Sequence, residues 1–536
     1  MNKIFILITV LILASCSPQS EKTSNDFDTI FQGGTIVDGL GNSSFKADIG
    51  IKGGIITKIS KESLNINNAT ETINIEGLTL SPGFIDNHAH IQTTIHEHPL
   101  AENFIHQGIT TIMAALHSGD QPWPLDEYAS NLEVSPNIGF FAGHSWIRTQ
   151  VLGLENRAPT ETELQRMRDL TTETMKQGAL GISTGLLYVP ANFAETEEVI
   201  ELSKIAGEYG GVYVTHMRDE AMGLLDSVRE TIRIADEANI PAQINHHKAI
   251  GVSQWGWSKM SLKLIDEANA RGLDVKHDLY PYTASSTRSA VLFPQWALSG
   301  GRDEFTKRVA NPETREKMEK DMMDIFQFER TGGDLNRVQF RVLYSDPSYN
   351  GKTLGDFAHD LGLDNNLENG IDITIDLQLK GGFSAIFHAM DEEDVIRILT
   401  HPLAMIETDG DPVSYGVGHP HPRSYGAFPR VLARYVRDLK VLTLEEAIKK
   451  MTSMPANQFN QPLRGRIIEG AIADITIFDP DTIQDTATYE DPHNYAVGIN
   501  HVMVGGEFAK KYGALTGNKP GVWIRGPSRP DRLVKN

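Results

Sequence analysis

The sequence predicts an α/β protein built on a (β/α)8 TIM-like barrel, with a small β-sandwich domain and an insertion over the barrel mouth. Residues 81–460 alternate short apolar runs with helical patterns, and eight such runs can be counted. The two ends, residues 28–80 and 461–536, instead alternate apolar and polar residues between glycine turns. Residues from about 300 to 395 are charged and helix-rich and interrupt the alternation. Both chain ends are therefore expected to form the β-sandwich, and the interruption to form the insertion.

Length and charge limit the classes of function. A chain of 536 residues with 40% hydrophobic residues can bury a large core and accessory parts. Its formal net charge of −21 argues against a nucleic-acid partner, since phosphate binding needs clustered Lys and Arg. A small-molecule substrate is compatible with this charge, and the oligomeric state is left open.

The first residues have the pattern of an export signal. Lys3 precedes the apolar run Ile4 to Ala14, which is too short to span a bilayer core of ~30 Å as a helix. The run ends in Leu13-Ala14-Ser15-Cys16, which resembles a bacterial lipobox and implies cleavage before Cys16 and lipid on its sulfur. Residues 1–15 would then be a lipoprotein signal peptide and 16–27 a tether. We expect a bacterial cell-envelope protein, periplasmic or outer-membrane, that touches the membrane only through this lipid; an ordinary secretory signal is the alternative.

The predicted helices and strands follow from local patterns. Thr160 and Glu163 have the spacing of a capping box, and Gly178 ends the amphipathic segment that follows. A second helix is expected from Thr196 to Tyr209. Because the carboxyl ends of parallel barrel strands form one face, residues just after the apolar runs should line a common site.

Histidines recur at that position. Six polar residues follow the runs: His88, His90, His117, His216, His246 and Asp409. His88 and His90 are two apart in an extended segment, so both can face one metal ion. A single buried histidine is usually structural, but six polar residues at successive strand ends are costly to bury without a purpose. Imidazole and carboxylate are the usual ligands of catalytic zinc, so the sequence predicts a metal centre.

Six stretches carry a resemblance to a known family. They are residues 81–90, 143–148, 178–190, 215–220, 278–284 and 421–426. Together they resemble the N-acyl-D-amino-acid deacylase (D-aminoacylase) family of the amidohydrolase superfamily, over about residues 29–526. The resemblance implies a barrel hydrolase that cleaves linear amides.

The resemblance also implies roles for the metal-site residues. His216 and His246 would hold a tightly bound zinc, and His88 and His90 a second, weaker metal. Asp409 would be the general base that carries a proton from water to the leaving nitrogen. Tyr188 would donate to the oxyanion, or would simply pack at the barrel mouth.

Substrate recognition follows from the same resemblance. Lys248, Tyr282 and Arg423 would hold the substrate α-carboxylate, although each cation could also be a surface charge. Arg288 lies close to Tyr282 in sequence and would favour an acidic substrate side chain, or would be a solvated loop charge.

One departure concerns the metals. His117 stands where the family usually has a cysteine. A thiolate can bridge two metals, whereas a neutral imidazole offers one lone pair to one metal. We therefore expect one tightly bound Zn²⁺ and a second site that is weak or empty.

The preferred function is hydrolysis of N-acyl-D-amino acids or small dipeptides ending in a D-residue. The second hypothesis for an enzyme is a cyclic-amide hydrolase of hydantoinase or dihydroorotase type. A non-catalytic lipoprotein that binds envelope fragments is a third.

Overall fold

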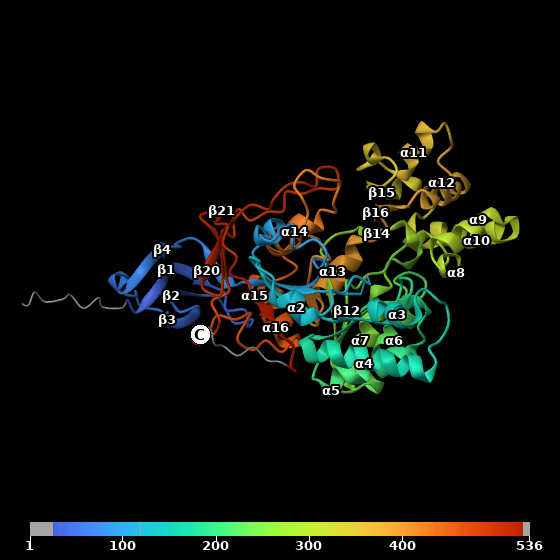
Figure 1. The fold of residues 1–536 in the computed structure, drawn as a ribbon. Helices are drawn as coiled ribbons and strands as arrows, with labels where there is room; N and C mark the ends of the chain where they lie inside the picture. Colours follow the sequence, from blue (N-terminus) through green and yellow to red (C-terminus); the bar gives the residue numbers. More distant parts are fainter. Residues whose placement is uncertain (1–24, 118, 529–536) are drawn as a thin grey trace, which may run out of the picture.

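The computed structural model describes residues 25–117 and 119–528 of the chain. It has a β domain, a central barrel and a separate lobe (Figure 1). The predicted signal peptide and Cys16 lie outside the described residues. Within the described part, no helix is both long enough and apolar enough to cross a membrane.

The barrel has eight strand positions, all parallel to their neighbours. The strands are β6 (Phe84–Ala89), β7 (Ile109–Ala114), β8 (Asn137–Phe140) continued by β9 (Ala142–Gly143), β10 (Gly181–Gly185), β11 (Val212–His216), β12 (Ala242–Ile244), β13 (Val275–Leu279) and β17 (Ala404–Ile406). β8 pairs with β7 and β9 pairs with β10, so one interrupted strand joins two half-barrels. The barrel predicted from the sequence is confirmed.

The barrel closes between its first and last strands. The Asn87 side chain donates to Ile406 O at 2.6 Å, and the Asp409 N–H donates to His88 O at 2.9 Å. These two hydrogen bonds take the place of regular backbone pairing between β6 and β17 and bring the ends of the two strands together. Two of the polar residues predicted for the site, His88 and Asp409, are thereby fixed side by side.

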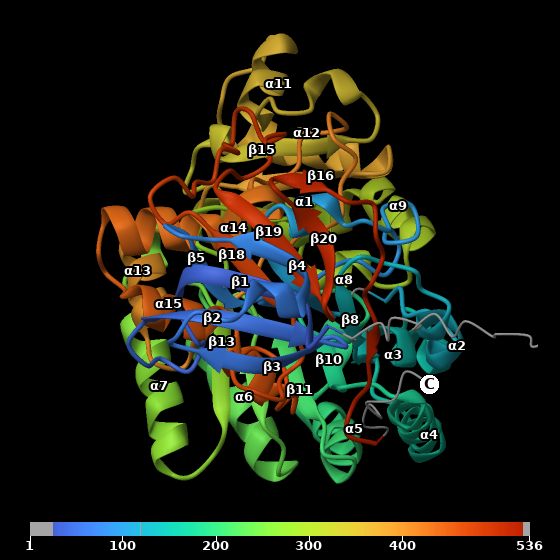
Figure 2. The same ribbon diagram turned by 90° about the vertical axis from the view of Figure 1, so that its left-hand side faces the viewer.

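Helices surround the barrel (Figure 2). They are α1 (Glu102–Ile105), α2 (Leu125–Ser130), α3 (His144–Leu152), α4 (Glu161–Gln177), α5 (Thr196–Glu208), α6 (Leu224–Glu237), α7 (Ser258–Ala270), α13 (Glu392–Thr400), α14 (Arg423–Arg430) with a π-helical continuation (Val431–Asp438), α15 (Leu444–Met451) and α16 (Ser453–Gln458). α4 begins with the expected capping box of Thr160 and Glu163 and ends at Gly178, whose φ is 116°. Its buried residues Met167, Thr171 and Thr174 recur at helical spacing, so one face of α4 packs inward.

Both chain ends build one β domain. Its strands are β1 (Phe27–Ile36), β2 (Phe45–Lys52), β3 (Ile55–Ser60), β4 (Ala69–Asn74), β5 (Thr79–Pro82), β18 (Ile475–Phe478), β19 (Ile499–Val504), β20 (Glu507–Lys511) and β21 (Ala514–Leu515). They form a nine-stranded sheet in which β5 pairs with β1 on one edge and with β18 on the other. A last strand, β22 (Trp523–Ile524), returns to the barrel and pairs with β8.

The insertion is a lobe with its own core. It contains β14 (Ser285–Arg288), α8 (Gln295–Leu298), α9 (Arg302–Ala310), α10 (Pro312–Asp324), a π-helical turn (Ile325–Arg330), β15 (Val338–Leu343), α11 (Leu354–Asp360), α12 (Leu367–Leu379) and β16 (Phe383–Phe387). β16 pairs antiparallel with both β14 and β15. The lobe therefore starts at Ser285, earlier than the expected boundary near residue 300, because β14 belongs to its sheet. α13, which spans the expected end of the insertion near residue 395, packs on barrel helix α7.

Candidate active site and metal centre

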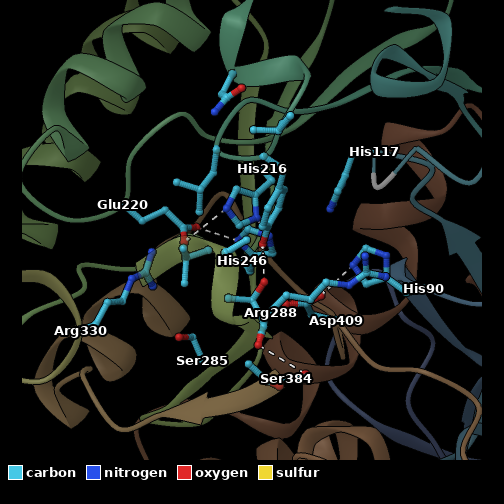
Figure 3. A pocket seen from close by; sticks show the side chains of 18 of the residues that line it. His90, His117, His216, Glu220, His246, Ser285, Arg288, Arg330, Ser384 and Asp409 are labelled. Atoms are coloured by element: carbon cyan, nitrogen blue, oxygen red, sulfur yellow. Dashed lines mark hydrogen bonds and ion pairs between the residues drawn. The ribbon is translucent and has the colours of Figure 1, made fainter. Parts of the chain in front are cut away.

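A cavity of about 610 Å³ opens at the carboxyl ends of the barrel strands (Figure 3). Its walls come from the barrel loops and from the lobe, which contributes Arg288, Arg330 and Ser384 among others. Of the predicted site residues, the cavity lining includes His90, His117, Tyr188, His216, His246, Lys248, Arg288, Asp409 and Arg423. His88 lies just beneath them, 1% exposed.

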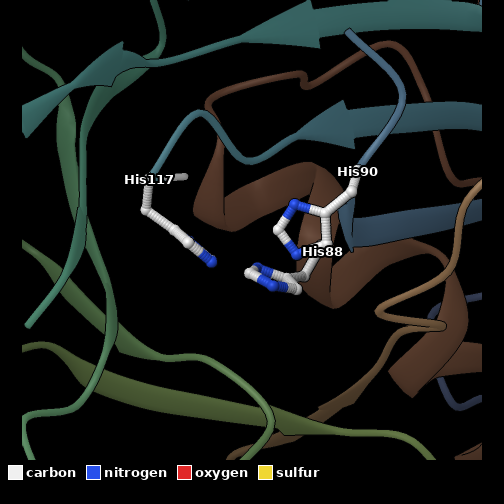
Figure 4. Close-up of side chains that lie close together, drawn as sticks. All are labelled: His88, His90 and His117. Atoms are coloured by element: carbon white, nitrogen blue, oxygen red, sulfur yellow. The ribbon is translucent and has the colours of Figure 1, made fainter. Parts of the chain in front are cut away.

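Three histidines from the first two strands converge (Figure 4). The rings of His88 and His117 lie 5.1 Å apart, and those of His90 and His117 lie 4.9 Å apart, measured between centroids. One nitrogen from each of the three lies within 4.8 Å of the others. The i, i+2 spacing of His88 and His90 thus places both on the side expected from the sequence.

A second group forms at the ends of β11 and β12. His216 Nδ1 and His246 Nε2 lie 2.8 Å apart, and His246 Nδ1 lies 2.8 Å from Glu220 Oε1. Glu220 is 3% exposed and also accepts from Lys248 Nζ at 2.6 Å. A carboxylate on Nδ1 of His246 turns its Nε2 towards His216, and a carboxylate behind a histidine is the usual arrangement of histidine metal ligands.

These side chains fit a metal ion. Burial lowers the pKa of His88 to about 4 and holds the pKa values of His117, His216 and His246 well below the usual range, so the imidazoles are neutral. Both ring nitrogens of His88, Nδ1 of His117 and Nε2 of His216 are buried without a hydrogen-bond partner. Buried imidazole nitrogens normally have a partner, and neutral imidazole is the form that binds zinc.

Asp409 stands between the histidines and a cation. Its Oδ1 lies 3.1 Å from His90 Nε2 and 3.6 Å from His88 Nε2, and its Oδ2 lies 2.8 Å from Arg423. Burial raises the pKa of Asp409, but Arg423 and the two histidines outweigh it and hold the pKa well below its usual range. Asp409 is therefore an ionised carboxylate positioned to accept a proton.

The backbone is strained where two of these residues sit. His246 has φ 37° and Asp409 has φ 44°, in the left-handed region that non-glycine residues seldom adopt. The buried Asp278 carboxylate accepts the His246 N–H, and buried Asp86 accepts the Thr408 N–H at 3.1 Å. These two carboxylates hold the turns that aim the imidazole and the carboxylate into the cavity.

The predicted tyrosine is replaced by its neighbour. Tyr282, expected to hold the α-carboxylate, does not line the cavity; it packs against Arg430, whose guanidinium lies 4.6 Å from its ring centroid. The Tyr282 N–H donates to Tyr280 O at 2.9 Å, so the chain turns at Pro281 and Tyr282 leaves the line of the strand. Tyr280 lines the cavity instead, with Arg423 4.5 Å and Lys248 5.6 Å from its ring centroid.

Tyr188 and Arg288, the remaining predicted residues, both line the cavity. Tyr188 lies with its ring 4.7 Å from that of His216, and its hydroxyl lies 3.0 Å from Thr287 Oγ1. Burial raises the pKa of Tyr188, which keeps the phenol protonated and able to donate. Arg288 is exposed at the edge of the cavity, with no ion pair among the described residues.

Sequence reasoning missed Glu220 and Tyr280. Glu220 follows His216 by four residues within a stretch that the resemblance had already marked, which was the available signal. Tyr280 directly follows Leu279, the last residue of β13, and this position at the carboxyl end of a strand was the available signal.

A barrel of this topology, with converging histidines and one carboxylate at its carboxyl face, is typical of hydrolases of the amidohydrolase class. Comparison with known proteins narrows the class. The Amidohydrolase family model matches residues 356–509. The chain is 36% identical to the D-aminoacylase of Alcaligenes xylosoxydans xylosoxydans over 527 residues, covering 94% of this chain and 98% of the relative. It is 32% identical to the N-acyl-D-glutamate deacylase of the same organism, covering 89% and 93%.

Solved structures agree. A crystal structure of D-aminoacylase superposes with a TM-score of 0.78 at 33% identity, covering 93% of this chain and 99% of that one. The N-acyl-D-glutamate deacylase of Bordetella bronchiseptica, complexed with zinc and a phosphonate inhibitor, gives 0.77 at 30% identity, with coverage of 93% and 99%. A D-hydantoinase at 15% identity and a TM-score of 0.55 shares the fold alone. The protein belongs to the D-aminoacylase family of the amidohydrolase superfamily, and it is an enzyme of that family's amide-hydrolysing type.

Proposed function

We propose that the protein hydrolyses the amide bond of N-acyl-D-amino acids, or of small dipeptides that end in a D-residue, with the help of zinc. The observation that carries the proposal is the position of Asp409, between His88 and His90 on one side and Arg423 on the other. A proton acceptor thus lies between candidate metal ligands and a cation that suits a substrate carboxylate. D-aminoacylase and N-acyl-D-glutamate deacylase, the relatives at 36% and 32% identity, support the substrate class.

Zinc would be held most firmly by His216 and His246, with His117 close by, and His88 and His90 would offer a weaker second site. When bound there, zinc polarises an amide carbonyl and lowers the pKa of water towards about 7. The neutral state of these imidazoles is the form that such binding needs.

The chain's own residues account for the remaining steps. Arg423 has five N–H donors, so it can keep Asp409 and still bind an α-carboxylate, with Lys248 and Tyr280 beside it. Asp409 Oδ1 accepts a proton from the attacking water as its oxygen joins the carbonyl carbon. It then gives that proton to the nitrogen as the C–N bond breaks, releasing a carboxylate and a free amine. Tyr188 is placed to donate to the carbonyl oxygen.

The test is a hydrolysis screen of the full chain after zinc loading, with N-acetyl-D- and N-acetyl-L-amino acids and with hydantoins. We expect release of D-amino acids, loss of the activity on chelation and its return with zinc. If only hydantoins were hydrolysed, the activity would be that of a cyclic-amide hydrolase. Binding of these compounds without turnover would favour a ligand-binding lipoprotein instead.

We further propose that Cys16 carries the lipid that anchors the protein in the bacterial envelope. The lipobox-like residues before it support this proposal. Labelled palmitate should enter the wild-type protein and be absent from a Cys16→Ala variant, and label in both would contradict the assignment.

A further inference from the structure

One buried arginine in the cavity has no hydrogen-bond or ion-pair partner for its guanidinium among the described residues; the guanidinium lies 5.7 Å from the ring centroid of Phe387. Arg330 ends the π-helical turn of the lobe, is 3% exposed and lines the cavity. Its Nε is buried without a hydrogen bond. Within the part of the chain that the structure describes, no carboxylate forms an ion pair with it and no carbonyl accepts from it.

The other cavity arginines differ from it. Arg423 pairs with Asp409, Arg218 with Glu230 at 2.8 Å, and Arg341 with Asp411. Arg288 is unpaired but exposed, so water satisfies it. Burying an unpaired guanidinium is costly, and proteins usually supply a counter-charge. Arg330 is therefore the one buried arginine among the described cavity residues that has no carboxylate paired with it.

The groups around Arg330 do not cancel its charge. Asp219, a carboxylate near Glu329 in the same cavity wall, already accepts the N–H groups of Ala221 and Gly223, at 2.7 and 2.9 Å. Burial raises the pKa of Glu329 to about 7, so this neighbour is partly neutral near neutral pH. Neither carboxylate is within ion-pair distance of Arg330.

The surroundings also offer a second donor. Ser285, the first residue of β14, lines the same cavity, is 6% exposed, and its hydroxyl has no partner. In Figure 3, Arg330 and Ser285 lie on the side of the cavity away from His90 and His117. A guanidinium and a hydroxyl that line one cavity suit a carboxylate, which accepts two or more hydrogen bonds.

We propose that Arg330, aided by Ser285, binds a second carboxylate of the substrate, so that the enzyme prefers diacids. This inference rests on the proposed function, in which Arg423 holds the α-carboxylate. The second carboxylate has two chemical sources. It is either the side chain of an acidic D-residue or the far end of a dicarboxylic acyl group such as succinyl.

The experiment compares two matched pairs of substrates on the zinc-loaded wild-type chain. N-acetyl-D-glutamate against N-acetyl-D-glutamine tests the side chain, and N-succinyl- against N-succinamoyl-D-methionine tests the acyl group. Within each pair only the charge differs. We expect kcat/KM to favour the acid of one pair by roughly 10- to 100-fold, as for a hydrogen bond to a charged group. The pair that shows the preference identifies the source.

Variants of Arg330 test whether this residue causes the preference for the acid. In Arg330→Met, kcat/KM for the acid and for its matched amide should agree within about threefold. Arg330→Lys should keep part of the preference, because lysine keeps the charge but lacks the bidentate fork of arginine. Turnover of N-acetyl-D-methionine by Arg330→Met shows that the site still folds. Arg302→Met removes an arginine of the same lobe outside the cavity and should leave the ratio unchanged.

Three outcomes would overturn the inference and leave the proposed function standing. The wild type could show no preference for the acid, or Arg330→Met could keep the wild-type preference. The third is that the preference disappears only in Arg288→Met. If no N-acyl-D-amino acid is hydrolysed, the proposed function fails instead. Calorimetry then decides on the subsite. N-acetyl-D-glutamate should bind the wild type more tightly than it binds Arg330→Met, and equal or absent binding would reject the subsite.

Discussion

Glu220 offers the sharpest test of how the metal ligands are held. Its carboxylate accepts from His246 Nδ1 at 2.8 Å and from Lys248 Nζ at 2.6 Å, and it is 3% exposed. Glu220→Gln keeps the shape and removes the charge. Loss of a carboxylate behind a histidine ligand typically weakens metal binding about 10- to 100-fold, or roughly 1.4–2.7 kcal/mol.

The same change leaves Lys248 charged and buried. Burial already lowers the pKa of Lys248 while Glu220 opposes that shift, so the variant should lower this pKa further. Breaking a buried pair costs about 3–5 kcal/mol, and we expect the lower end because glutamine keeps one acceptor oxygen. Glu220→Gln should therefore be less stable by about 3 kcal/mol in urea unfolding of the metal-free protein.

A matched control exists elsewhere in the barrel. Glu198 is 4% exposed, lies 2.8 Å from His144 Nε2 and pairs with Arg148, but it belongs to none of the candidate metal-binding groups. Glu198→Gln should lose similar stability and leave zinc affinity unchanged. The readout is the zinc dissociation constant by chelator competition at pH 7. If Glu220→Gln bound zinc within about threefold of the wild type, the positioning role would be refuted.

Asp409→Asn should lower kcat about 10²- to 10⁴-fold while zinc stays bound, and turnover near the wild-type rate would remove Asp409 as the base. Elemental analysis after gentle purification should find about one tight zinc per chain, rising towards about two in His117→Cys because a thiolate can bridge; two tight ions in the wild type would contradict this. Burial lowers the pKa of Lys450 from 10.5 to about 8, so its charge costs stability most at low pH and the cost falls as pH rises. Relative to Lys450→Met, the wild type should gain about 2 kcal/mol in urea unfolding between pH 7 and pH 9.5, and a flat difference would contradict the shift.

Strand periodicity made much of the site predictable. His88 and His90 share a side because extended residues repeat every two positions, and His216 and His246 end strands whose apolar runs are legible in the sequence. The barrel followed from the alternation of such runs with helices. The capping box at Thr160 fixed the start of α4.

Other features depend on contacts that no local pattern records. The turn at Pro281 moves Tyr282 out of the cavity and leaves Tyr280 in it. His144 also ends an apolar run, but it pairs with Glu198 and remains outside the site. Glu220 gains its role only when β12 brings His246 beside it. The early start of the lobe at Ser285 reflects pairing with Phe387, about a hundred positions later.

The shared β domain has a consequence for how the chain folds as it is made. β5 pairs through Leu80 with Ile477 of β18, so this edge stays open until almost the whole chain has left the ribosome. The eight barrel strands are synthesised in between, and most of them can pair with a neighbour already present. The first strands to emerge are thus among the last to be completed, and their unpaired edge is exposed to other chains throughout synthesis. Misassembly during production should begin there.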